Sequence, residues 1–248
     1  MSDKQNISWC VEYLKRYNGI ERLPAISNAE VFRALSNVTM PRDLSEEFYK
    51  RQDDALKSIL AEKNITDVAN FDDGITIYKG DITLIKADAI VNACNDKMLG
   101  CFVPGHHCID NAIHSFAGLQ LRRDMMKIMD RQGHDEPNGD CKVTLGYNLP
   151  AKYVFHTVGP IYSGKKQDET DLANCYLSCL RKADEMKLDS IVFCCLSTGV
   201  FGYPNDKAAE IAVKQVKEFL AKENKNLKKI IFNVFLEKDY VIYKKLLG

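Results

Sequence analysis

The sequence predicts an α/β protein in which helices cover both faces of a largely parallel sheet, as in an α/β/α sandwich. From Phe71 onward, short runs rich in β-branched residues alternate with longer amphipathic segments. Strands that alternate with helices in this way are typical of parallel sheets with crossover helices. Before Phe71 the apolar residues recur only at helical spacing. We therefore expect a helical N-terminal extension over residues 1–70 and an α/β domain over residues 71–248.

The N-terminal extension is predicted to contain three helices. Apolar residues recur every three or four positions over 7–14, 29–35 and 43–63, which is typical of amphipathic helices. Asn28 directly precedes the second helix and is a preferred N-cap residue. These helices carry no set of catalytic side chains, so we expect them to dock on the main domain and to have a structural role.

The main domain is expected to alternate strands with helices as far as its last residue. Strands are predicted over residues 75–79, 89–94, 142–147, 153–158, 190–196 and 230–236. Helices are predicted over residues 107–129, 168–186, 206–223 and 238–247. Open α/β sheets bind ligands where the carboxyl ends of strands meet the N-termini of helices. The polar loop between the strand 89–94 and the following helix is therefore the first place to look for a site.

Composition limits the classes of function. The chain has 248 residues, and its 34 basic residues balance 34 acidic ones, so no global field attracts it to nucleic acid or to a membrane surface. Its first residues lack an apolar leader segment, and no apolar run approaches the roughly 18 residues needed to span a bilayer. We expect a cytoplasmic protein with reduced cysteines, of which Cys175, Cys179, Cys194 and Cys195 lie in apolar patterns and are predicted to pack in the core.

Two turns have residues suited to a nucleotide ligand. Ser197-Thr-Gly-Val-Phe-Gly-Tyr203 follows a predicted buried strand and opens a helix, an arrangement that favours an anion such as phosphate. It matches neither the Walker pattern nor the Rossmann fingerprint, so a purely structural turn is an equal alternative. Asp81, in the turn Gly80-Asp-Ile-Thr83, could accept a hydrogen bond from an exocyclic amine. An Asp in a turn more often bonds its own backbone.

Three soft metal ligands cluster after the strand 89–94. Cys101, His106 and Cys108 lie within eight residues, with His107 as an alternative ligand, and this set suits Zn²⁺ better than Mg²⁺ or Ca²⁺. Three ligands with one open position is the arrangement of catalytic zinc sites. A loop without metal is the competing interpretation from spacing alone. His114 lies among apolar helix residues and is expected to be a hydrogen-bonded core histidine.

Six ordered segments of the chain resemble the signature segments of macrodomains. They are Gly80–Thr83, Ile90–Asn95, Ile109–His114, Ala117–Gly118, His156–Pro160 and Leu196–Pro204. The resemblance covers about residues 71–248. Where hydrolytic macrodomains commonly carry a glycine-rich stretch, this chain has Gly-Cys101-Phe-Val-Pro-Gly-His106-His-Cys108. With the helical extension, this departure is similar to the zinc-containing macrodomains of microbial sirtuin-linked operons, which are protein-ADP-ribose hydrolases.

The resemblance implies a role for each matched residue. Asp81 would hold the adenine N6, and Ile82 would offer its backbone N–H to the ring. Asn95 would bond the hydroxyls of the distal ribose, and Phe201 would pack beside it. The pyrophosphate would lie between two backbone segments, formed by Ser197, Thr198, Gly199, Val200, Phe201 and Gly202 on one side and by Cys108, Ile109 and Asp110 on the other.

The implied function is zinc-dependent release of mono-ADP-ribose from an acidic side chain of a modified protein, a small lipoyl-carrier-like protein among the candidates. Zn²⁺ would activate water, polarise the leaving carboxyl or position the ribose, and these three roles stay open. Asn95 and Asp110 are the candidate catalytic residues, with Asp110 the general base if the metal only positions substrate. The alternatives are an ADP-ribose-binding macrodomain that does not cleave its ligand and a structural zinc module without a nucleotide site.

Overall fold

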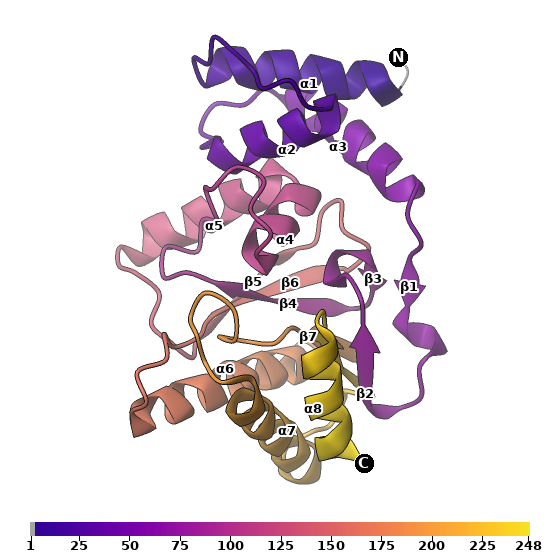
Figure 1. The fold of residues 1–248 in the computed structure, drawn as a ribbon, viewed down its shortest axis with the longest axis vertical. Helices are drawn as coiled ribbons and strands as arrows, with labels where there is room; N and C mark the ends of the chain where they lie inside the picture. Colours follow the sequence, from indigo (N-terminus) through magenta and orange to yellow (C-terminus); the bar gives the residue numbers. More distant parts are fainter. Residues whose placement is uncertain (1–2) are drawn as a thin grey trace.

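The computed structural model describes residues 3–248 and contains one six-stranded mixed sheet (Figure 1). Its strands lie in the order β2-β8-β7-β4-β6-β5, and only β5, at one edge, runs antiparallel to its neighbour. The strands are β2 (Gly74–Lys79), β4 (Ala89–Cys94), β5 (Cys141–Leu145), β6 (Tyr153–Val158), β7 (Ser190–Phe193) and β8 (Lys229–Val234). The prediction of a mixed, largely parallel sheet is confirmed.

Helices cover both faces of the sheet, so the predicted three-layer arrangement is also confirmed (Figure 1). One face carries α4 (Ile109–Ala117) and α5 (Leu119–Gln132), and the other carries α6 (Lys166–Glu185), α7 (Asn205–Lys222) and α8 (Glu237–Leu247). The main hydrophobic core lies between these layers and the sheet. Cys175, Cys179 and Cys194 are buried in it as predicted, while Cys195 is half-buried.

Three further helices lie on the outer side of the α4–α5 layer (Figure 1). They are α1 (Asp3–Tyr17), α2 (Asn28–Val38) and α3 (Glu46–Ala61), and they enclose a second apolar core around Leu14, Phe32 and Phe48. Leu119 of α5 completes this second core. The helical extension therefore packs against the helix layer of α4 and α5. These two helices follow the loop that contains Cys101, His106 and Cys108, called here the candidate metal loop.

The last helix of the extension ends at Ala61, two residues before the predicted end at residue 63. Residues 66–67 form the short strand β1, which pairs in parallel with β3 (Ile85–Lys86), and two 3₁₀ turns, η1 (Val68–Asn70) and η2 (Ile82–Leu84), lie beside them. Val68 belongs to the main core. A two-residue strand has no periodicity of its own, which explains why the sequence pattern did not show it.

Two predicted helix limits are wrong for local physical reasons. The N-cap of α2 is Ser27, not Asn28, because Ser27 and Glu30 form a reciprocal capping box. The single helix predicted over 107–129 is broken at Gly118, whose φ of +98° is disfavoured for residues with a Cβ atom. A Cβ atom there would also lie 2.7 Å from the Gln52 side chain. Gly118 thus lets α3 approach the junction of α4 and α5.

The strands β7 and β8 end earlier than predicted, at Phe193 and Val234.

None of the described helices has both the length and the apolar character needed to cross a membrane.

Candidate functional site

The three predicted metal ligands lie together in the loop between β4 and α4. The ligand atoms of Cys101, His106 and Cys108 all lie within 4.8 Å of one another, and Cys101 Sγ is 3.6 Å from His106 Nδ1. His107 is not part of this cluster. Burial raises the pKa of the Cys108 thiol to about 11. A cation is therefore needed to hold it as the thiolate that binds metal, and two sulfurs with one imidazole suit Zn²⁺.

The N-terminus of α4 carries the cluster and a buried carboxyl. Cys108 is the N-cap residue, and its Sγ accepts a hydrogen bond of 3.4 Å from the backbone N–H of Asn111. Asp110, in the first turn, does not cap the helix. Its Oδ1 accepts a hydrogen bond of 2.8 Å from Asn92 Nδ2. Burial raises the pKa of Asp110 to about 6, and the Asn92 hydrogen bond and the Arg122 charge oppose that rise. A carboxyl that titrates near neutrality is suited to proton transfer.

A chain of buried polar groups extends from Asp110 across the sheet. Asn92 Nδ2 also lies 3.2 Å from His156 Nδ1, and His156 Nε2 lies 2.9 Å from Thr144 Oγ1. His114 is a core residue as predicted, but it is not hydrogen-bonded: Nε2 lies 3.5 Å from Asp110 Oδ1, outside bonding geometry, and neither ring nitrogen has a hydrogen-bond partner in the described chain. Burial lowers the pKa of His156 to about 3 and that of His114 well below its usual range.

The loop after β7 presents backbone N–H groups. Ser197 has a φ of +62° and Gly202 a φ of +67°, and the turn is closed by hydrogen bonds from Gly202 N to Gly199 O and from Tyr203 N to Ser197 O. Within residues 3–248, the N–H groups of Gly199, Val200 and Phe201 donate to no protein acceptor. The same holds for the N–H groups of Ile109 and Asp110. Unpaired N–H groups in a turn and at a helix N-terminus form an anion site.

The sheet topology places these two segments next to each other. β4 and β7 are parallel neighbours, so the loops that follow them both leave from the carboxyl ends of the strands. Gly159, which follows β6, approaches the β7 loop so closely that a Cβ atom there would lie 2.1 Å from Ser197 Oγ. The structure therefore brings Cys101, His106 and Cys108, the Asp110 carboxyl and the N–H groups of residues 199–201 to the carboxyl ends of the strands.

Asp81 and Ile82 follow β2 and therefore also lie at the carboxyl ends of the parallel strands. Asp81 Oδ1 caps the turn by accepting from Thr83 N at 2.9 Å and from Thr83 Oγ1 at 2.7 Å, while Oδ2 has no protein partner in the described chain. The buried Ile82 has an N–H group that donates to no protein acceptor within residues 3–248. Asp81 borders a cavity of about 130 Å³ that is also lined by Leu56, Ile59 and Leu60 of α3. The turn role and an available carboxylate oxygen thus coexist.

Asn95 is half-buried and its side chain braces its own loop. Its Nδ2 donates to Gly100 O at 3.3 Å, and its Oδ1 accepts from Lys97 N at 3.1 Å. Its Oδ1 retains capacity for a second donor.

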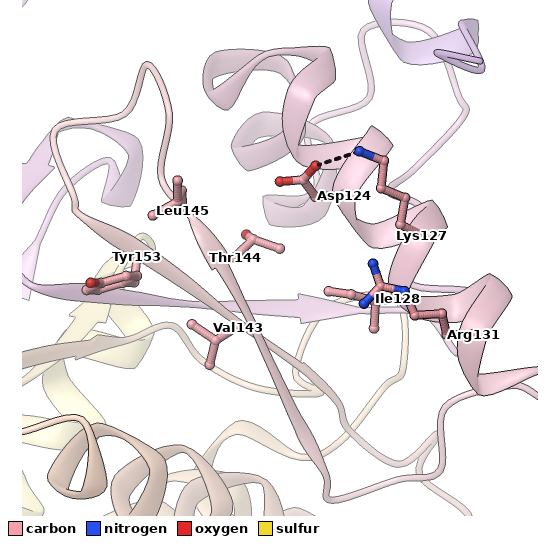
Figure 2. Close-up of a pocket in the computed structure, with 8 residues that line it drawn as sticks. All are labelled: Asp124, Lys127, Ile128, Arg131, Val143, Thr144, Leu145 and Tyr153. Atoms are coloured by element: carbon pink, nitrogen blue, oxygen red, sulfur yellow. Dashed lines mark ion pairs between the residues drawn. The ribbon is translucent and has the colours of Figure 1, made fainter. Parts of the chain in front are cut away.

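A larger cavity, of about 440 Å³, lies away from all the predicted site residues, between α5 and the edge strand β5 (Figure 2). Among the polar side chains that line it, Lys127 forms an ion pair with Asp124. We place the candidate site at the other location because unpaired N–H groups, a metal-ligand cluster and a carboxyl of raised pKa converge there.

Sequence reasoning missed four side chains that support the site: Asn92, His156, Arg33 and Asn37. Asn92 is a polar residue in an otherwise apolar buried strand, and this was a readable signal. Arg33 and Asn37 lie on α2, remote in sequence from the metal loop, and carried no such signal.

The Macro domain family model matches residues 91–212. A protein-ADP-ribose hydrolase of Treponema medium is 46% identical over the full length of both chains. A protein-ADP-ribose hydrolase of Staphylococcus aureus (strain MRSA252) is 47% identical over 87% of this chain and 83% of its own. Among solved structures, the Trypanosoma brucei macrodomain in complex with ADP-ribose is 30% identical with a TM-score of 0.69, covering 91% of this chain and 97% of that chain. The chain belongs to the macrodomain family.

Proposed function

We propose that this protein is a hydrolase that removes mono-ADP-ribose from an acidic side chain of a modified protein, with a Zn²⁺ ion held by Cys101, His106 and Cys108. The observation that carries the proposal is the location of this metal-ligand cluster at the N-terminus of α4, two residues from the buried Asp110. The names of the T. medium and S. aureus relatives support the hydrolase class.

The arrangement of the site suits ADP-ribose as the ligand. The free N–H groups of residues 199–201 and of the α4 N-terminus can bind a pyrophosphate without a basic patch, consistent with the balanced charge of the chain. The free Oδ2 of Asp81 and the N–H of Ile82 can pair with the donor and acceptor on the adenine edge. The likeness to a macrodomain solved with ADP-ribose supports this assignment.

The chemistry to be accelerated is cleavage of a ribosyl C1 bond through an oxocarbenium-like state. Zn²⁺, when bound, would supply Lewis-acid charge beside the distal ribose. Asn95, whose Oδ1 can accept from a second donor, would bond the ribose hydroxyls. Asp110, oriented by Asn92 and titrating near pH 6, can accept a proton from the attacking water.

An acidic side chain is the proposed point of attachment because a carboxylate is a better leaving group than an alcohol or an amide. No Glu lies between Asn92 and Asp110 that could protonate a poor leaving group. A site that fixes the ribose and one water then suffices for a carboxyl ester. The proposed biological role is reversal of sirtuin-type ADP-ribosylation, with a small lipoyl-carrier-like protein as substrate.

The test compares release of ADP-ribose from carboxyl-linked, serine-linked and arginine-linked mono-ADP-ribosylated proteins, each with and without a zinc chelator. We expect fast release from the carboxyl-linked protein and loss of that release in chelator. Equal rates on all three linkages would refute the linkage and leave the hydrolase. Binding of ADP-ribose without release from any of the three would instead show a non-catalytic reader.

A further inference from the structure

The candidate metal loop is held by side chains of the N-terminal extension. Arg33, on α2, donates from Nη2 to His106 O at 3.0 Å and to Asn111 Oδ1 at 2.9 Å. Asn111 in turn donates from Nδ2 to Val103 O at 2.9 Å and to Cys101 O at 3.4 Å. One guanidinium and one amide therefore hold the main chain at two of the three ligand residues.

Asn37, one helical turn further along α2, holds the middle of the loop. It is fully buried, its Oδ1 accepts from Gly105 N at 2.9 Å, and its Nδ2 donates to Ser115 Oγ at 2.8 Å. Gly105 has a φ of +65° and precedes His106. Asn37 thus joins the turn that aims His106 to the body of α4.

Arg122 of α5 locks α2 against the start of the loop. Its guanidinium, with 1% of the residue exposed, donates to Leu99 O at 2.7 Å and to the α2 carbonyls of Ser36 and Asn37 at 2.8 and 3.0 Å. It also lies 4.5 Å from the ring centre of Phe102, which is in the loop. The carbonyls at the end of α2 are therefore satisfied by the same group that fixes the start of the loop.

A loop without regular secondary structure keeps three ligand atoms within 4.8 Å only if its backbone is restrained. Most of the restraints on residues 99–108 that cross elements come from α2 and from Arg122. We infer that the N-terminal extension is a positioning element for the metal site, in which Arg33 and Asn37 pre-organise the loop for Zn²⁺. This inference rests on the proposed zinc site and adds that a macrodomain core lacking α2 would not hold the metal well.

The experiment measures zinc affinity of the full-length, chelator-stripped protein by competition with a chromophoric chelator. The variants are Arg33→Lys, which keeps the charge but loses the fork that reaches both acceptors, and Asn37→Ala. The matched control is Arg51→Ala, which removes another arginine of the extension that pairs with Glu47 and packs on Trp9. Circular dichroism and thermal melts establish that each variant is folded.

We expect zinc to bind the Arg33→Lys and Asn37→Ala proteins about 10 to 100 times more weakly, the usual effect of losing a group that orients a metal ligand. Arg51→Ala should bind within about twofold of the wild type, since Arg51 pairs with Glu47 of its own helix and packs on Trp9 of α1. In the metal-free protein, the Gly105 amide should exchange hydrogen faster in Asn37→Ala than in Arg51→Ala.

The outcomes separate this inference from the proposed function. A wild type that binds zinc together with unchanged affinity in both α2 variants would overturn the inference and leave the zinc assignment. An equal loss in Arg51→Ala would also overturn it, because the effect would then be a general loosening of the extension. A wild type that binds no zinc would overturn the zinc assignment itself. Should Asn37→Ala fail to fold, Arg33→Lys decides.

Discussion

Two histidines buried in neutral form predict a loss of stability in mild acid, and His156 is the clearer case. Burial lowers the pKa of His156 to about 3 in the folded protein, against 6.5 for an ordinary histidine. A folded pKa below the unfolded one means that the unfolded chain binds more protons as the pH falls. The stability that His156 contributes is therefore fully present above pH 6.5 and is lost progressively below it.

The magnitude follows from these two pKa values. Between pH 7 and pH 5, protonation of His156 in the unfolded state lowers the free energy of unfolding by about 2 kcal/mol. His114, whose pKa burial also lowers, acts in the same direction. Asp110 opposes them: burial raises its pKa to about 6, so its contribution to stability rises by about 1 kcal/mol over the same interval. The loss of stability from His156 and His114 together exceeds the gain from Asp110. The metal-free protein should therefore be less stable at pH 5 than at pH 7.

The assay is urea unfolding of the chelator-stripped protein at pH 7 and pH 5, for the wild type and His156→Gln. The glutamine side chain does not bind a proton in this range, so the loss between the two pH values should be about 2 kcal/mol smaller in the variant, whatever its stability at pH 7. His134→Gln, in an exposed loop, is the control. An identical pH dependence in wild type and His156→Gln would refute the claim that His156 is held neutral in the core.

Three further predictions concern the candidate site and the junction of α4 and α5 at Gly118. Purified protein should carry about one zinc per chain by elemental analysis, and unchanged metal content in a Cys101→Ser, His106→Ala double variant would disprove the ligand set. Asp81→Ala should weaken ADP-ribose binding by roughly 1.5 to 3 kcal/mol in calorimetric titration, the value of a hydrogen bond to a charged group; equal affinity in the folded variant would move adenine recognition elsewhere. Gly118→Ala should destabilise the protein by about 1 to 3 kcal/mol in denaturant unfolding, because φ there is +98° and a Cβ atom would lie 2.7 Å from the Gln52 side chain. A loss below about 0.5 kcal/mol would show that the backbone relaxes at this position.

The fold class and the proximity of the three candidate metal ligands were predictable because both depend on local patterns. Alternating strand and helix periodicities indicate a parallel sheet. In such a sheet, the loops that follow the strands all lie at the carboxyl ends of the strands. Cys101, His106 and Cys108 lie within eight residues, so the loop that joins them cannot carry them far apart. The sequence therefore determined what kind of site to expect, and that it would lie at the carboxyl ends of the strands.

The partners of these groups depend on contacts between distant parts of the chain, which no local pattern records. His156 is 64 residues from Asn92, and Arg33 is 73 residues from His106. The break at Gly118 lets α3 pack close to the junction of α4 and α5, a contact that the periodicity of residues 107–129 does not record. Side chains such as Asn37 and Arg122 read as ordinary polar helix residues until packing buries them and assigns them acceptors. Only the tertiary structure decided which groups orient the metal loop and Asp110, because burial and hydrogen-bond partners arise when separate elements meet.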